Sequence, residues 1–212
     1  CSNTPAVELA EKLVQMTPKQ FTHVFFTNSG SEANDTNIRL IRRYWDTKKQ
    51  PKKRIILART NAYHGSTIAS ASLGGFEFVH NQFETLPYVQ HITDPNWYHN
   101  GADLSPDEFG LHAARELEKK IDQLGEENIA AFIAEPIQGA GGVIVPPDSY
   151  WPEVRRILNE RDILFVSDEV ICGFGRTGNM FGCETYGMEP DLLTFAKAVT
   201  NGFQPLGGVM VS

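Results

Sequence analysis

Hydrophobic and polar positions group along the chain into blocks that predict helices and strands in turn. Apolar side chains recur at helical spacing over four segments, residues 6–16, 31–48, 105–124 and 151–161. Short apolar runs predict strands at residues 23–27, 54–58, 129–135, 163–170, 192–197 and 207–212. Strands separated by helices are typical of an α/β protein with a mostly parallel sheet flanked by helices.

Two stretches rich in Gly, Pro, Asn and aromatic residues, 76–104 and 139–150, are predicted to be long loops. Ligands of open α/β sheets bind beyond the carboxyl ends of the strands, so the residues that follow strands are the candidates for chemistry. These are residues 27–31, residues 58–65, Glu135, Asp168 and Lys197.

Composition places the chain among ordinary globular proteins. Of its 212 residues 41% are hydrophobic and 21% charged, which excludes compositional disorder. The formal net charge of -7 gives no global field that attracts nucleic acid, so any anionic ligand needs a local binding device. Because no apolar run approaches the roughly 18 residues of a membrane span, we expect no membrane partner.

The three cysteines, Cys1, Cys172 and Cys183, lack the spacing of a disulfide framework or a zinc site. They predict thiols in a reducing compartment, a cytoplasmic location and no metal. The chain starts at Cys1 without Met, and its last residues, GGVMVS, read as a strand. We therefore expect it to be a piece of a longer protein.

The segment TNSGSEAN, residues 27–34, combines a strand end, a turn of small residues and a helix start. Such a junction directs backbone N–H groups and the positive end of the helix at one point, which suits a phosphate. Gly30 permits close approach of the backbone, and the hydroxyl of Ser31 can donate a further hydrogen bond. A plain helix cap, with Ser31 as the N-cap, is the alternative.

Asp168 and Lys197 each end an apolar strand. A carboxylate there is costly to bury unless it is paired, for example with a protonated heterocyclic nitrogen; an ordinary salt bridge or an exposed strand end is the alternative. A lysine there is expected to be partly desolvated, which favours the neutral amine nucleophile; a surface lysine is the alternative.

The segment NAYHG, residues 61–65, places an aromatic ring and an imidazole after a strand. Tyr63 could cover a flat cofactor, although core packing is the ordinary role of such a pair. A phosphate cradle, an aspartate, a lysine and a stacking ring together match the needs of pyridoxal 5′-phosphate.

Five ordered motifs, SGSEAN, YHG, EPIQGAGG, SDEVICGFGRTG and FAKAVTNG, resemble those of class III aminotransferases. The separation of 29 residues between Asp168 and Lys197 is also similar to that of the family. The resemblance covers residues 5–212 and implies the large domain of a fold type I pyridoxal-phosphate enzyme. DEVICGFGRTG together with NAYHG is most similar to the ω-amino-acid:pyruvate branch.

The resemblance implies a role for each matching residue. Lys197 forms the Schiff base with the cofactor and afterwards moves the proton, while Asp168 pairs with the pyridinium nitrogen. The phosphate is bound by Gly30 and Ser31, and the two faces of the ring are contacted by Tyr63 and Val170. The substrate side of the site is lined by Glu135 and His64.

The implied reaction transfers an amino group from an ω-amino acid or amine to a 2-oxo acid such as pyruvate, in two half-reactions. The family resemblance further implies a homodimer with its sites at the interface. It places a substrate-binding arginine in a C-terminal domain and a phosphate-binding threonine on the other subunit. We therefore expect residues 1–212 alone to associate and to lack activity. Ile171 stands where several relatives have glutamine, which favours the pyruvate-using branch.

Three alternatives remain at this stage. GFGRTG, residues 173–178, matches the glycine pattern of dinucleotide-binding turns, but no helical pattern follows it, and a loop is favoured. Another class III enzyme, such as a mutase, racemase or decarboxylase, would use the same cofactor. An inactive scaffold would have no reason to retain both Lys197 and Asp168.

Overall fold

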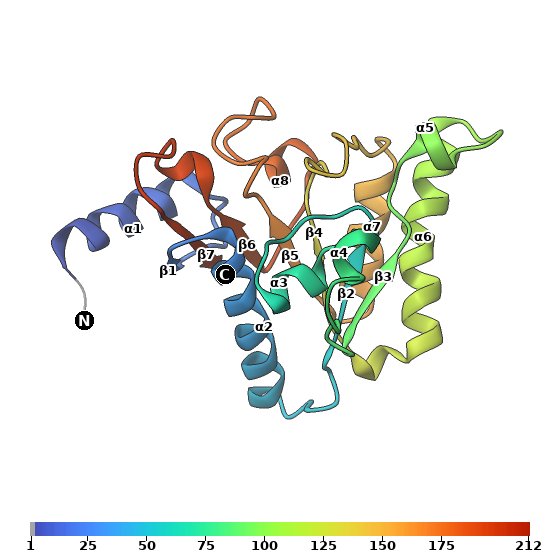
Figure 1. Ribbon diagram of the computed structural model, residues 1–212, viewed down its shortest axis with the longest axis horizontal. Helices are drawn as coiled ribbons and strands as arrows, with labels where there is room; N and C mark the ends of the chain where they lie inside the picture. The colour runs from blue at the N-terminus through green and yellow to red at the C-terminus, as the bar shows by residue number, and fades with distance from the viewer. Residues whose placement is uncertain (1–2) are drawn as a thin grey trace.

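A computed structural model describes residues 3–212 and shows one twisted sheet between helices (Figure 1). The strands are β1 (His23–Thr27), β2 (Ile55–Arg59), β3 (Val89–Ile92), β4 (Ile129–Ala134), β5 (Leu164–Asp168), β6 (Leu192–Phe195) and β7 (Gly207–Val211). Their order across the sheet is β1-β7-β6-β5-β4-β2-β3. The pairs from β3 to β6 are parallel, and β7 is antiparallel to both of its neighbours. The predicted mostly parallel α/β sheet is confirmed.

Helices cover both faces of this sheet. They are α1 (Thr4–Met16), α2 (Gly30–Thr47), α3 (Ile68–Leu73), α4 (Glu77–His80), α5 (Trp97–Asn100), α6 (Pro106–Leu124), α7 (Tyr150–Glu160) and α8 (Gly182–Thr185). Successive strand residues point to opposite faces, so Leu57 packs in the core beneath α6 and α7, whereas Ile56 packs in the core beneath α2. Within residues 3–212, no helix has the length and apolar character needed to cross a membrane.

Local sequence explains the longest helix, α6. Ser105 is its N-cap and accepts a hydrogen bond from the Glu108 N–H, while the Glu108 carboxylate accepts one from the Ser105 N–H. Pro106 occupies the first turn, and Gly125 ends the helix with a φ of 83°. The helix predicted over 105–124 is confirmed.

The prediction of one long loop over residues 76–104 is wrong, because this stretch contains α4, β3 and α5. Strand β3 has only four residues, and only Val89 and Ile92 at its ends are buried, so no clear alternation marks it. It forms the sheet edge beside β2. Two predicted strands also end early: β5 stops at Asp168 and β6 at Phe195. Val170 therefore lies in the turn after β5, and Lys197 begins a short 3₁₀ helix, Lys197–Val199.

Candidate active site

The carboxyl ends of the strands meet at one cavity. Strand β1 runs in the same direction as β6, because both are antiparallel to β7. The cavity has a volume of about 400 Å³, within the range of small-molecule sites. All eight predicted site residues line it: Gly30, Ser31, Tyr63, His64, Glu135, Asp168, Val170 and Lys197.

The turn between β1 and α2 forms one wall of the cavity. Ser29 is the N-cap of α2, since its Oγ accepts a hydrogen bond from the Glu32 N–H at 3.2 Å. The alternative with Ser31 as the N-cap is therefore wrong. Ser31 Oγ instead accepts the Ser66 N–H at 3.0 Å, which leaves its hydroxyl proton available for an anion at the helix N-terminus.

Gly30 brings the backbone of this turn against Val170. A Cβ at Gly30 would lie 2.9 Å from Val170 Cγ2 and 3.6 Å from Ala196 Cβ. Any larger residue would therefore displace Val170, which lines the same cavity. Close packing of the turn thus explains the glycine in SGSEAN.

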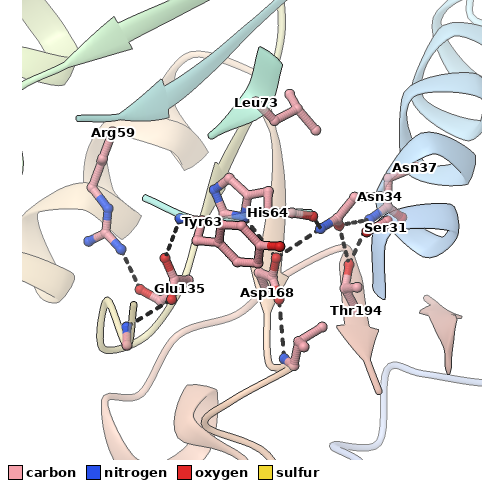
Figure 2. Close-up of polar contacts among 12 residues, drawn as sticks. Ser31, Asn34, Asn37, Arg59, Tyr63, His64, Leu73, Glu135, Asp168 and Thr194 are labelled. Atoms are coloured by element: carbon pink, nitrogen blue, oxygen red, sulfur yellow. Dashed lines mark hydrogen bonds and ion pairs between the residues drawn. The ribbon is translucent and has the colours of Figure 1, made fainter. Parts of the chain in front are cut away.

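Asp168 ends β5 with its carboxylate buried, at 2% exposed surface. Its Oδ2 lies 2.7 Å from His64 Nδ1 and 2.9 Å from Asn34 Nδ2, while Oδ1 accepts the Val170 N–H at 3.1 Å (Figure 2). Three hydrogen-bond donors therefore stabilise the buried carboxylate. Because Asp168 also lines the cavity, it can accept a hydrogen bond from a ligand there.

His64 is buried, and its ring nitrogen Nδ1 is hydrogen-bonded to the Asp168 carboxylate. Its other ring nitrogen, Nε2, is buried without a hydrogen-bond partner among the described residues. The polar contact of His64 is therefore with the aspartate carboxylate.

Lys197 lines the cavity and is exposed. The desolvation expected at the end of its strand is wrong, since β6 stops two residues earlier. Its φ of 46° falls in the left-handed region, which few residues other than glycine adopt. Such a conformation is costly and is retained at functional sites where the surrounding structure fixes it.

Glu135 joins two loops of the cavity. Its Oε1 accepts the Tyr63 N–H at 3.1 Å and its Oε2 accepts the Gly139 N–H at 2.9 Å (Figure 2). Burial raises the pKa of the Glu135 carboxyl, and the nearby His64 opposes this rise. The carboxylate of Glu135 therefore fixes the backbone of the residue whose ring covers the cavity.

Two residues near the site lie in the candidate segments but were given no role of their own. Arg59 is fully buried at the end of β2 and donates to the backbone carbonyl of Glu135. Asn34, on α2, donates to Asp168. Asp168 was identified because it is a charged residue at the end of an apolar strand, and the same signal is present at Arg59. No sequence signal separates Asn34 from other polar residues in the first turns of a helix.

The donor and acceptor groups fit pyridoxal 5′-phosphate. The helix N-terminus and the Ser31 hydroxyl suit a phosphate, and the buried Asp168 carboxylate suits a protonated ring nitrogen. Tyr63, whose side chain is 39% exposed, offers an aromatic face to a flat ring, and Lys197 offers an amine. Each group lines the same cavity.

A family model described as Aminotransferase class-III matches residues 1–212, and the chain belongs to this family. Class III aminotransferases use pyridoxal 5′-phosphate. The chain is 58% identical over 211 residues to putrescine–pyruvate aminotransferase of Pseudomonas aeruginosa, covering 99% of this chain and 46% of that protein. It is 48% identical over 214 residues to the chloroplastic gamma aminobutyrate transaminase 3 of Solanum lycopersicum, covering 100% of this chain and 41% of that one.

Solved structures show the same fold. The omega transaminase of Pseudomonas jessenii in complex with PMP has a TM-score of 0.98 and 45% identity, covering 100% of this chain and 47% of that one. An (S)-enantioselective omega transaminase of Thermomicrobium roseum has a TM-score of 0.96 and 47% identity, with coverage of 100% and 47%. These matches confirm the fold type I assignment. The chain spans about half the length of the curated relatives it matches.

Proposed function

We propose that this chain forms the cofactor-binding part of an aminotransferase that transfers an amino group from an ω-amino acid or amine to a 2-oxo acid, with pyruvate as the acceptor. The observation that carries the proposal is the meeting of Asp168, Lys197 and the Ser29–Ser31 turn in one cavity. Family membership supports the reaction class. The similarity to the putrescine–pyruvate aminotransferase of Pseudomonas aeruginosa supports a diamine donor and pyruvate as the acceptor.

When bound, pyridoxal 5′-phosphate supplies an aldehyde that exchanges with amines and a ring that withdraws electrons. Gly30 and Ser31 would bind its phosphate through the N-terminus of α2, which favours negative charge. Tyr63 and Val170 would contact the ring, and their positions are set by Glu135 and Gly30 respectively. These contacts would orient the cofactor in the cavity.

Two side chains would handle protons. Asp168 would hold a proton on the ring nitrogen, because a buried carboxylate stabilises positive charge more strongly than one in water. Lys197 would hold the cofactor through its amine, and the free amine would serve as the base that moves a proton at the amine-bearing carbon of the substrate. Lys197 lines the same cavity as Asp168.

We further propose that residues 1–212 are the incomplete large domain of a cytoplasmic homodimer, with an N-terminal segment and a C-terminal small domain in the whole protein. The chain covers only 46% of the length of the Pseudomonas aeruginosa enzyme, which supports the presence of these further parts in the whole protein. Free buried thiols at Cys172 and Cys183 support a reducing compartment; Cys1 lies outside the described residues. Exposed apolar residues such as Phe203 and Phe78 support subunit association.

The experiment that tests the proposed reaction follows the visible absorption of the holoenzyme. Adding an ω-amine donor should bleach the band of the bound cofactor, and pyruvate should restore it. The Lys197→Ala variant should not cycle in this way. A wild-type protein that binds no cofactor, or whose band does not respond to any amine, would contradict the proposal.

A further inference from the structure

A chain of buried side chains leads from α2 and β6 to the carboxylate of Asp168. Asn34, Asn37 and Thr194 are each at most 1% exposed. Asn37 Nδ2 donates to Thr194 Oγ1 at 2.7 Å and to Asn34 Oδ1 at 3.1 Å. Thr194 Oγ1 in turn donates to Asn34 Oδ1 at 2.9 Å (Figure 2). The oxygen of the Asn34 amide therefore receives two hydrogen bonds from the side away from the cavity.

The opposite end of the same amide faces two acceptors. Asn34 Nδ2 donates to the backbone carbonyl of His64 at 2.7 Å and to Asp168 Oδ2 at 2.9 Å. All four hydrogen-bonding positions of the Asn34 side chain are thus used. A flipped amide would place its oxygen against the His64 carbonyl and the Asp168 carboxylate, which both accept, so the His64 carbonyl on one side and Asn37 and Thr194 on the other determine which end meets Asp168.

This orientation has a consequence for Asp168. Asn34 can only donate to the carboxylate, and the Val170 N–H donates to its other oxygen. Both oxygens are therefore held as acceptors. A group in the cavity that pairs with Asp168 must itself be a donor.

We infer that Asn34, oriented by Thr194 and Asn37, is a positioning residue that fixes the Asp168 carboxylate as the acceptor for the protonated ring nitrogen of the cofactor. This inference rests on the proposed function. It assigns to α2 a second role besides phosphate binding, because the helix that begins at Gly30 also carries Asn34 and Asn37.

The test uses the holoenzyme loaded with cofactor labelled with ¹⁵N at its ring nitrogen, whose chemical shift reports protonation. Thr194→Val removes the hydroxyl and preserves the shape of the side chain, whereas Thr194→Ser retains the hydroxyl. Asn34→Leu removes the whole amide. Ser72→Ala is the matched control, because Ser72 is also a fully buried hydroxyl but its bonds go to the Ile68 carbonyl and the Leu86 N–H, outside the site.

We expect the ring-nitrogen signal to move towards the unprotonated position in Thr194→Val and further in Asn34→Leu. The amine half-reaction should slow about tenfold or more in these variants, the effect of losing a hydrogen bond to a charged group. Thr194→Ser and Ser72→Ala should retain the wild-type signal. Unfolding midpoints identify any variant that fails to fold. If Asn34→Leu does not fold, the comparison of Thr194→Val with Thr194→Ser tests the inference.

Two results would overturn the inference. One is a folded Thr194→Val or Asn34→Leu holoenzyme with the wild-type signal and rate. The other is a Thr194→Ser signal that moves as far as that of Thr194→Val, since packing and not the hydroxyl would then be responsible. Failure of the wild-type protein to bind the cofactor would contradict the proposed function and is distinct from both.

Discussion

Glu135 Oε1 accepts a hydrogen bond from the backbone N–H of Tyr63 at 3.1 Å, across a separation of 72 residues. The Glu135 backbone carbonyl is itself held by the buried guanidinium of Arg59. A buried charged side chain at the end of β2 therefore binds the carbonyl of Glu135, and the carboxylate of Glu135 binds the loop that carries the Tyr63 ring. Glu135 therefore contributes to the placement of Tyr63.

Glu135→Gln should weaken cofactor binding about tenfold and lower the unfolding midpoint. The amide has one acceptor oxygen where the carboxylate has two, so either the Tyr63 or the Gly139 N–H loses its partner in this partly buried site, at a cost of about 1 kcal/mol. Titration of the cofactor and thermal unfolding measure the two effects. Glu108→Gln is the control, because that carboxylate also accepts a backbone N–H but lies on α6. An unchanged cofactor dissociation constant in Glu135→Gln would exclude the role in placing Tyr63.

The sequence predicts most of the fold because strand periodicity and helix caps are local. It predicts the cavity because parallel strands place their carboxyl ends together, which identifies Asp168 and Lys197 without knowledge of their contacts. The roles of Asn34 and Arg59 could not be predicted in this way. Their partners lie 134 and 76 residues away, so their roles depend on tertiary contacts alone.

Lys197 should be the lysine to which the cofactor is attached. Borohydride reduction of the holoenzyme followed by peptide mapping should place the label on Lys197 Nζ. Lys53 serves as the internal comparison, because it is buried but its amine is bound to the Asp162 carbonyl at 2.7 Å. A label on Lys53 or on any other lysine would contradict the assignment.

Gly30→Val should raise the dissociation constant of the cofactor more than tenfold. The new side chain would displace Val170, whose Cγ2 lies 2.9 Å from the position of a Cβ at Gly30, and would narrow the phosphate end of the cavity. Gly110→Ala is the comparison. Gly110 lies on α6, outside the cavity, and a Cβ there would collide with Ser149 Oγ at the start of α7. That variant should lose stability without losing cofactor affinity. Equal cofactor affinity in Gly30→Val and wild type would leave the turn as an ordinary helix cap.

Glu169 should make the stability of the protein depend on pH. Burial raises the pKa of its carboxyl from 4.5, and hydrogen bonds from the Gly182 and Cys183 N–H groups only partly oppose this. The folded state therefore binds the proton more tightly than the unfolded state. The stabilisation is fully present below pH 4.5 and is lost as the pH rises through the raised pKa.

Denaturant unfolding of the cofactor-free protein at a series of pH values measures this effect. The free energy of unfolding of wild type relative to Glu169→Gln should fall between acid and neutral pH. A difference between the two proteins that stays constant over this range would show that Glu169 does not titrate as the structure indicates.

The most direct test of the central claim is the amine half-reaction of Asp168→Asn, measured in a single turnover of the loaded enzyme. The variant should still bind the cofactor, because the phosphate turn and Lys197 are intact. Its half-reaction should slow by orders of magnitude, since the neutral amide cannot stabilise the protonated ring nitrogen that withdraws electrons. A near-normal rate in a folded, loaded Asp168→Asn protein would contradict the account of this cavity as a pyridoxal-phosphate transamination site.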